Sequence, residues 1–334
     1  MKKLYLPENY ESKLTLRETE EAIKFVRDSF EKGISKALNL YRVSAPLFVF
    51  PSTGLNDQLN GTERRVSFDI KNIKEEVEIV QSLAKWKRHA LHRYGFNVGE
   101  GLYTNMNAIR RDEDLDSMHS CYVDQWDWEK VISKDIRNEA YLKETVKALY
   151  NVIYNLSLDV ESKYGISHNL PKEITFISTE ELLKMYPNLD ASQREKEAAK
   201  KYGAIFLMQI GDTLSNGYPH DGRAADYDDW KLNGDIILYY DVLDIAFEIS
   251  SMGIRVDSES IKYQLHKKNE DYKLENAYVK GILSNTLPLT IGGGVGQSRL
   301  CMFMLKKAHI GEVQSSVWTD DDIKALESKN IHLL

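Results

Sequence analysis

Near its C-terminus the chain reads Leu289-Thr-Ile-Gly-Gly-Gly-Val-Gly-Gln-Ser-Arg299-Leu-Cys-Met. An apolar stretch runs into four glycines within five residues, and an arginine and an apolar run at helical spacing follow. Glycine permits positive φ and has no Cβ to hold a ligand away from the backbone. The N–H groups at a helix start attract anions, and an arginine adds a guanidinium that binds phosphate. The pattern predicts a phosphate-binding segment; an ordinary strand-to-helix turn with a surface arginine is the alternative interpretation.

The composition is that of a globular protein. The 334 residues are 42% hydrophobic and 28% charged, which suits one large or two modest domains. The net charge of −7 argues against a polynucleotide-binding protein, because such proteins are usually basic. Two cysteines, Cys121 and Cys301, exclude a disulfide framework and a four-cysteine zinc site. No apolar run is long enough to span a membrane. We therefore expect a cytoplasmic enzyme or binding protein that binds neither nucleic acid nor a membrane.

Hydrophobic periodicity predicts an α+β fold with an antiparallel sheet. Helices are expected from a capping box at Thr15 and Glu18, along a stripe over residues 142–153, and from Asp190 to Gly203. Strands are expected at residues 43–50, 66–70, 174–177, 204–210 and 235–240, and as a pair at 247–250 and 253–257. The strands do not alternate regularly with helices, so a parallel α/β sheet is disfavoured. No linker is visible, and a single domain over 1–334 is predicted.

Polar side chains gather in four segments that also carry apolar residues: 80–88, 109–129, 235–255 and the glycine segment. Taken alone, the first is typical of a basic helix with one solvated face. In the second, strand alternation places Gln125, Asp127 and Glu129 on one side, between two tryptophans. These residues form either a solvent-facing row or the floor of a pocket.

The third segment contains paired acids. Asp235 and Glu248 lie on neighbouring predicted strands and can share Mg²⁺ with a nucleotide triphosphate. Arg255 is a residue type that binds a carboxylate bidentately. Paired acids together with arginines on two separate segments, at 110 and 299, suit nucleotidyl transfer, in which a carboxylate attacks a neutralised α-phosphate.

These segments, in this order, resemble the catalytic core of class II aminoacyl-tRNA synthetases. Residues 20–50 resemble motif 1, residues 99–129 motif 2 and residues 289–307 motif 3. A closer resemblance, over nearly the whole chain, is to the ammonia-dependent asparagine synthetase (aspartate–ammonia ligase) family. It is carried by Ser82-Leu-Ala-Lys-Trp-Lys-Arg88, Gly99-Glu-Gly-Leu-Tyr-Thr104, Tyr122-Val-Asp-Gln-Trp-Asp-Trp-Glu129, Asp226-Tyr-Asp-Asp-Trp230 and Ser250-Ser-Met-Gly-Ile-Arg255. The resemblance implies an α+β fold with a class II aminoacyl-tRNA synthetase-like catalytic core, in which helices flank a central antiparallel sheet.

The resemblance also implies a reaction. L-aspartate and Mg-ATP would give a β-aspartyl adenylate and pyrophosphate, and ammonia would convert the adenylate to L-asparagine and AMP. The cofactor would be Mg²⁺, bound with ATP, and two copies of the chain would form a homodimer through motif 1. A glutamine-dependent route is disfavoured, because Met1 is followed by Lys2 and no cysteine lies at the N-terminus.

Roles at the ATP site follow from the resemblance. Arg110 would hold the α-phosphate, with Arg111 as a competitor for this role, and Arg299 would hold the γ-phosphate or the adenine face. The resemblance further implies that ATP contacts Glu113, Asp235, Glu248 and Gly294, with Asp235 and Glu248 as the metal ligands.

Roles at the aspartate site follow in the same way. Lys87 and Arg255 would bind substrate carboxylates. The resemblance places further residues nearby: Ser82, Gln125, Asp127 and Ser251. Asp57 or Asp127 would hold the α-amino group or orient ammonia, and the two roles stay open. The chain departs from the family at residues 51–56 and between Trp230 and Asp235, and we interpret both departures as loop changes at the rim of the site.

Two other functions remain. The first is a tRNA synthetase-like paralogue that adenylates aspartate for another acceptor. The second is a catalytically inactive module that binds aspartate or a nucleotide, which the presence of Lys87, Arg110, Glu248 and Arg299 disfavours.

Overall fold

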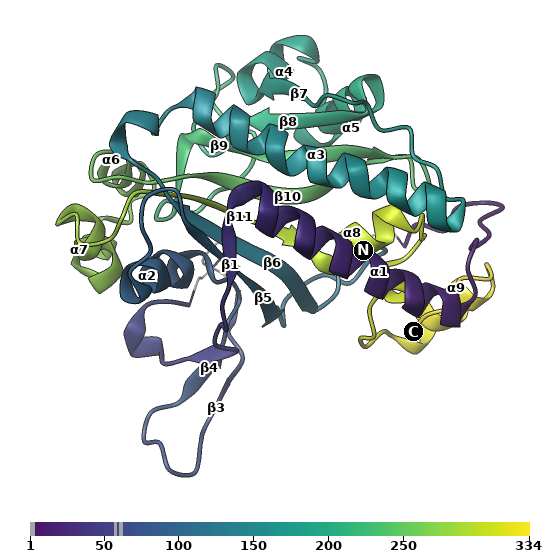
Figure 1. Cartoon of the computed structure of the whole chain (residues 1–334), viewed down its shortest axis with the longest axis horizontal. Helices are drawn as coiled ribbons and strands as arrows, with labels where there is room; N and C mark the ends of the chain where they lie inside the picture. Colours follow the sequence, from purple (N-terminus) through teal and green to yellow (C-terminus); the bar gives the residue numbers. More distant parts are fainter. Residues whose placement is uncertain (1–3, 57–58, 60–62) are drawn as a thin grey trace.

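The computed structural model describes residues 4–56, 59 and 63–334, and within them a large mixed sheet forms the centre of the molecule (Figure 1). This sheet has eight strands among the described residues, in the order β1-β5-β6-β11-β10-β9-β8-β7. Their bounds are β1 Leu40–Arg42, β5 Gly101–Ile109, β6 Tyr122–Val131, β7 Thr175–Ser178, β8 Ala204–Met208, β9 Asp228–Tyr240, β10 Ile245–Arg255 and β11 Thr290–Gly296. The inner pairs are antiparallel, as predicted, whereas the outermost pairs at both edges, β1 with β5 and β7 with β8, are parallel.

Helices flank the sheet, and a small second sheet projects from one side (Figure 1). The helices are α1 Leu16–Leu38, α2 Ala84–Tyr94, α3 Glu139–Tyr164, α4 Thr179–Met185, α5 Ala191–Tyr202, α6 Ser260–Lys267, α7 Ala277–Leu283, α8 Gln297–Met304 and α9 Asp320–Glu327. Short 3-10 turns span Pro51–Thr53, Lys134–Ile136, Asp271–Glu275 and Ile310–Glu312. The projecting sheet has the order β2-β4-β3, with β2 Phe48–Val49, β3 Ser67–Phe68 and β4 Val77–Ile79. Within the described ranges, no helix is both long and apolar enough to cross a membrane.

Helices α1 and α3 run side by side across one face of the sheet (Figure 1). Their apolar stripes are buried, and this confirms the periodicity found in the sequence. The predicted capping box also forms, because Thr15 Oγ1 accepts from the N–H of Glu18 while the Glu18 carboxylate accepts from the N–H of Thr15. Phe30 of α1 packs on Trp126 of β6 with ring centroids 4.6 Å apart. Burial of such a side chain contributes roughly 1.5–3 kcal/mol, so this layer holds the back of the sheet in place.

Several predicted strands have different limits. The stretch 43–50 is not one strand, because Pro46 has no N–H to donate; β1 ends before it and β2 begins after it in the other sheet. The half-buried strand expected at 66–70 is limited to β3, and both residues of β3 are exposed. The strand pair expected at 247–250 and 253–257 is the single strand β10, with register irregularities at Glu248/Ser250 and Gly253/Arg255.

Two segments expected to be turns or loops belong to the central sheet. The glycines of the 289–302 segment lie in β11, and none of Gly292, Gly293, Gly294 and Gly296 has positive φ. The stretch from Trp230 to Asp235, interpreted as a shortened loop, is part of β9. Both segments therefore belong to the sheet that carries the cavity described below.

Two histidines make the stability of the fold sensitive to acid. Nδ1 of buried His309 accepts from the N–H of Gly311 at 3.0 Å, and Nε2 of partly buried His168 lies 3.0 Å from the carbonyl oxygen of Met304. Burial lowers the pKa of each histidine to about 4. The unfolded chain, with histidine pKa values near 6.5, therefore binds protons at a higher pH than the folded protein does.

We expect the free energy of unfolding to fall by about 1 kcal/mol for each of these histidines between pH 7 and pH 5.5. Urea unfolding at the two pH values measures this loss. A His309→Asn variant should show a smaller loss, whereas His332→Gln, at an exposed position, should behave like the unmodified protein. Equal losses in all three proteins would contradict the role assigned to His309.

Candidate active site

A cavity of about 490 Å³ opens over the middle of the central sheet. Strands β6, β10 and β11 supply part of its lining, and α2, α8, residues 110 and 112–114 and residues 221–224 supply much of the rest. Most of the residues predicted for the site line it: Ser82, Lys87, Arg110, Glu113, Gln125, Asp127, Glu248, Ser251, Arg255, Gly294 and Arg299. Asp235 is described but is not part of the lining, and Asp57 lies outside the described residues. Segments far apart in the sequence therefore meet at one place.

The glycines of β11 leave room for the polar side chains of β6. Gly294 pairs with Asp127 of β6, and a Cβ on Gly294 would lie 2.7 Å from Gln125 Oε1 and 3.2 Å from Asp127 Oδ1. A Cβ on Gly292 would collide with the carboxylate of Glu129. These glycines are thus required for their missing Cβ and not for positive φ. Of the two interpretations of β6, the structure supports the pocket floor for Gln125 and Asp127, whereas Glu129 is buried outside the lining.

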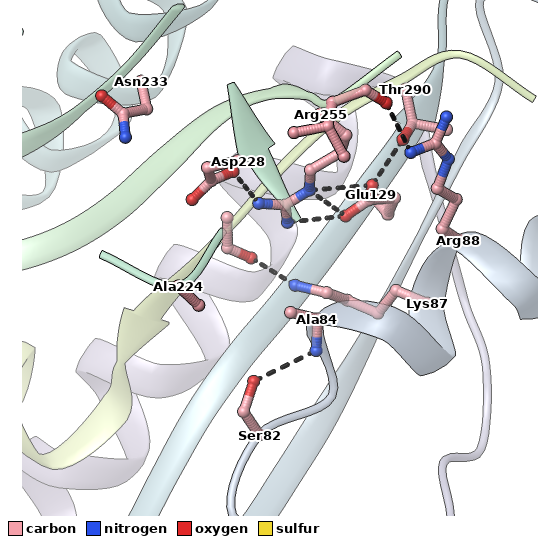
Figure 2. A network of polar contacts seen from close by, with 12 residues as sticks. Ser82, Ala84, Lys87, Arg88, Glu129, Ala224, Asp228, Asn233, Arg255 and Thr290 are labelled. Carbon is pink, nitrogen blue, oxygen red and sulfur yellow. Dashed lines mark hydrogen bonds and ion pairs between the residues drawn. The ribbon is translucent and has the colours of Figure 1, made fainter. Parts of the chain in front are cut away.

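A buried network of ion pairs lies beneath this floor. Arg255 at the end of β10 binds Glu129 of β6, with Nη2 2.7 Å from Oε2, and it also pairs with Asp228 of β9 (Figure 2). Thr290 Oγ1 donates to Glu129 Oε1 at 2.6 Å. Burial raises the pKa of Glu129, but the charge of Arg255 outweighs it and holds this pKa below its usual range. The network ties three strands together through ionised side chains.

Lys87 on α2 reaches the same floor. Its Nζ lies 2.6 Å from Asp127 Oδ1 and donates to the carbonyl oxygen of Gly293 at 2.9 Å. Both side chains are buried. The second carboxylate oxygen of Asp127, Oδ2, is buried and has no hydrogen-bond partner among the described residues. Since a buried polar atom without a partner is costly, Oδ2 is an acceptor that a ligand can satisfy.

The arginines of motifs 2 and 3 lie at another part of the lining. Arg110 follows β5, and its Nε is buried with no partner in the part of the chain that the structure describes. Arg111 is exposed and is not part of the lining, which favours Arg110 of the two candidates. Arg299 in the first turn of α8 donates to the carbonyl oxygen of Glu248 at 3.2 Å, and its Nη2 lies 2.8 Å from His119 Nε2.

The N-terminus of α8 binds a carboxylate of the protein itself, that of Asp124. Asp124 Oδ1 accepts from the N–H of Ser298 at 3.0 Å, and Asp124 Oδ2 accepts from the Ser298 hydroxyl at 2.8 Å. Arg27 of α1 holds the same carboxylate at 2.7 Å. The N–H of Ser298 is therefore not available to a ligand phosphate, because a carboxylate from β6 already satisfies it. Arg299, one residue further, lines the cavity and is the basic side chain of this segment that a ligand can reach.

The two predicted metal ligands differ in their access to the cavity. Glu248 lines the cavity, whereas Asp235 is buried and forms an ion pair with Arg223. Asp235 pairs in register with Ser251, and Glu248 pairs with Ile237, so the two carboxylates lie on adjacent strands. Burial raises the pKa of Asp235, and Arg223 opposes this effect. Oδ1 of Asp235 is buried without a partner among the described residues. Two carboxylates with a spare oxygen fit Mg²⁺, which needs only one or two of them when phosphates and water complete its shell.

Sequence reasoning assigned no role to four polar residues of the site or its support: His119, Asp124, Arg223 and Asp228. His119 accepts from Arg299, so Nδ1 carries the proton and donates to Asp116 Oδ1 at 2.8 Å. The only feature of the sequence that could have pointed to His119 was its position between Arg110 and the strand β6. The ion pairs of Asp124, Arg223 and Asp228 join elements that are distant in sequence. Local sequence patterns therefore do not predict these contacts.

Solved structures with the same fold are class II aminoacyl-tRNA synthetases. The asparaginyl-tRNA synthetase of Entamoeba histolytica in complex with asparaginyl-adenylate superposes with a TM-score of 0.65 at 12% identity, over 90% of this chain and 66% of that chain. The asparaginyl-tRNA synthetase of Pyrococcus horikoshii, also complexed with asparaginyl-adenylate, gives a TM-score of 0.63 at 15% identity, over 96% of this chain and 77% of that one. The predicted class II aminoacyl-tRNA synthetase-like α+β fold is confirmed.

Closer relatives define the family. Residues 17–330 match the family model described as aspartate-ammonia ligase. The aspartate–ammonia ligases of Bacillus cytotoxicus and Bacillus cereus are each 58% identical over 325 residues, which is 97% of this chain and 99% of each relative. The chain belongs to the aspartate–ammonia ligase family, and the family and ligase class predicted from the sequence are confirmed.

The buried ion pairs predict a large effect from a small substitution. Replacement of Glu129 by Gln should lower the free energy of unfolding by about 3 kcal/mol, because it removes the countercharge that Arg255 shares with Glu129 while Arg255 stays buried. Glu144→Gln on the exposed face of α3 is the matched control and should change stability by less than about 0.5 kcal/mol. Urea unfolding of both variants tests this, and equal stabilities would contradict it.

Proposed function

We propose that the enzyme makes L-asparagine from L-aspartate and ammonia through a β-aspartyl adenylate, with release of pyrophosphate and AMP. The observation that carries this proposal is that Lys87 and Arg255, suited to binding carboxylates, share one cavity with Arg110 and Arg299, suited to binding phosphates. A β-carboxylate and an α-phosphate can therefore be held next to each other. Holding two reactants in this way supplies much of the rate enhancement of a bimolecular step.

Aspartate would bind over the floor of the cavity. Asp127 Oδ2, which has no partner among the described residues, would accept from the α-ammonium group, while Lys87 and Arg255 would bind the carboxylates. Arg255 uses Nε and one N–H of each Nη for Glu129 and Asp228, so two of its five N–H groups remain for a ligand. Ser82, Gln125 and Ser251 line the same cavity and can donate further hydrogen bonds. The competing assignment of the ammonium group to Asp57 falls outside the described residues.

ATP would bind between the arginines. Arg110 would neutralise the α-phosphate, and its Nε, which lacks a partner within the described ranges, is available for this contact. Arg299, held by His119 and Glu248, faces the γ-phosphate or the adenine, and Glu113 and Gly294 complete the wall. Asp235 and Glu248 would hold Mg²⁺, which supplies charge neutralisation to the triphosphate when it is bound.

In the first step an oxygen of the β-carboxylate forms a bond to the α-phosphorus, and the bond to pyrophosphate breaks. In the second step ammonia attacks the acyl carbon, AMP leaves with its electron pair, and one proton is released. Donors such as Arg110, fixed before the charge develops, lower the barrier because they need no reorganisation.

Two neighbouring arginines test the phosphate site. Arg110→Ala should lower kcat about 10²–10³-fold, because a fixed donor to the developing charge is lost. Arg111→Ala should stay close to the unmodified enzyme, because Arg111 is exposed outside the lining. The assay mixes L-aspartate, Mg-ATP and ammonium chloride without tRNA and follows asparagine, AMP and pyrophosphate.

Asparagine formed one-for-one with AMP is the expected result for the unmodified enzyme. AMP without asparagine would indicate a tRNA synthetase-like paralogue with another acceptor, and no cleavage of ATP would indicate a binding module. Near-normal turnover by Arg110→Ala would refute its role. The same comparison with Arg299→Ala tests motif 3.

We further propose that the enzyme is a single catalytic domain that acts in the cytoplasm as a homodimer without nucleic acid. The net charge of −7 supports the last point. Support for the dimer comes from β1, an edge strand of the central sheet, where Tyr41 is 55% exposed. Leu47 and Phe48 nearby in sequence are also exposed. Open strand edges with apolar side chains are normally covered, and a second copy of the chain can cover this one.

Substitution of this edge should separate the two copies. Tyr41→Glu is expected to shift the mass measured by light scattering from that of two chains to that of one, because it buries a charge in the contact. Tyr218→Glu is the control, since Tyr218 is 73% exposed in the loop between β8 and β9, and it should leave the mass unchanged. A monomeric mass for the unmodified protein would refute the dimer.

A further inference from the structure

The loop between β8 and β9 brings Arg223 into the cavity. Arg223 lines the cavity, and its Nη2 forms an ion pair with Oδ2 of Asp235. Asp235 is itself buried and is not part of the lining. The other oxygen, Oδ1, has no partner among the described residues but is buried as well, so a cation in the cavity reaches this carboxylate only after Arg223 has moved away.

The second acid of the predicted metal site, Glu248, lines the same cavity as Arg223 and adds to the negative charge around it. Burial lowers the pKa of Arg223, but the charges of Asp235 and Glu248 outweigh it and raise this pKa. Glu248 lines the same cavity and is shared with Arg299, whose Nη1 lies 3.7 Å from Glu248 Oε2. Arg223 thus occupies the side of Asp235 from which a cation in the cavity would approach, in the same cavity as Glu248.

The position of Arg223 in the chain allows this contact to be exchanged. Arg223 lies in the loop 209–227 and not in a strand of the sheet, while both acids are fixed in β9 and β10. Asp221, two residues earlier, has a carboxylate oxygen 3.9 Å from Arg223 Nη1 and is itself exposed. An ion pair between a loop and a strand can open without loss of the strand ladder that carries the acids.

We propose that Arg223 is the resident counter-ion of the Asp235–Glu248 pair and that a divalent cation must displace it to bind there. This inference rests on the proposed function, in which the divalent cation accompanies ATP. The exchange keeps the buried carboxylate paired at every stage, and an unpaired buried charge would be strongly destabilising. Arg223 therefore weakens the binding of a free divalent cation. The site favours a divalent cation that is already bound to a polyphosphate.

The test measures Mn²⁺ binding to the nucleotide-free protein at pH 8, from the electron paramagnetic resonance signal of free Mn²⁺. Arg223→Ala should bind Mn²⁺ about tenfold more tightly than the unmodified protein, a change of about 1.4 kcal/mol. Arg223→Lys, which keeps the charge, should gain less. Lys231→Ala removes one positive charge from an exposed position of the strand that carries Asp235 and should bind Mn²⁺ like the unmodified protein.

Unchanged Mn²⁺ affinity in Arg223→Ala, or an equal gain in Lys231→Ala, would overturn the inference. The gain must also disappear when Asp235→Asn is added to Arg223→Ala, because the site then lacks its buried carboxylate. Circular dichroism checks each variant, and Arg223→Gln replaces the alanine variant if that variant does not fold. An enzyme that makes asparagine while Arg223→Ala shows no gain refutes this inference alone, whereas failure to make asparagine refutes the proposed function and leaves the Mn²⁺ comparison intact.

Discussion

The central sheet is organised around one buried cation, the guanidinium of Arg255. It is 3% exposed and binds carboxylates from two other strands, Glu129 of β6 and Asp228 of β9. Because side chains alternate along a strand, a slip of one residue would turn Glu129 to the opposite face and leave Arg255 without its main partner. The ion pairs therefore fix the register, and the register in turn requires Gly292, since any larger residue would collide with the Glu129 carboxylate.

The same constraint shapes the cavity above it. Because Glu129 is paired with Arg255, Lys87 pairs with Asp127, the next residue on that face. Lys87 contacts one oxygen of Asp127, and the other oxygen has no partner among the described residues. The floor thus consists of charged side chains held by ion pairs, and one of its buried acceptor atoms still lacks a hydrogen bond. A site of this kind is preorganised, because its donors and acceptors are oriented before a ligand arrives and need not move during the reaction.

Local patterns in the sequence predicted the parts of the fold that depend on local physics. The stripes of α1 and α3 and the capping box of Thr15 were predicted correctly, because helical spacing and capping involve residues three or four apart. The polar face of β6 was found by alternation, although alternation could not say whether it met solvent or a cavity. The division of β10 was wrong, because Ser250 and Ser251 interrupt its apolar pattern. Asp124 at the start of α8 and Arg223 on Asp235 were missed, since both contacts join residues that only the tertiary fold brings together.

The cavity must bind anionic substrates although the chain is acidic overall. Four of its cations are matched by carboxylates before any ligand binds: Lys87 by Asp127, Arg255 by Glu129 and Asp228, Arg223 by Asp235, and Arg299 by Glu248. Unmatched cations in so buried a place would destabilise the fold, and a buried pair contributes little net stability because desolvation offsets its attraction. Substrate oxygens can therefore take over contacts from protein carboxylates at small net cost. The selectivity of the site then depends on geometry, which the floor of β6 and β11 fixes, and not on an excess of positive charge.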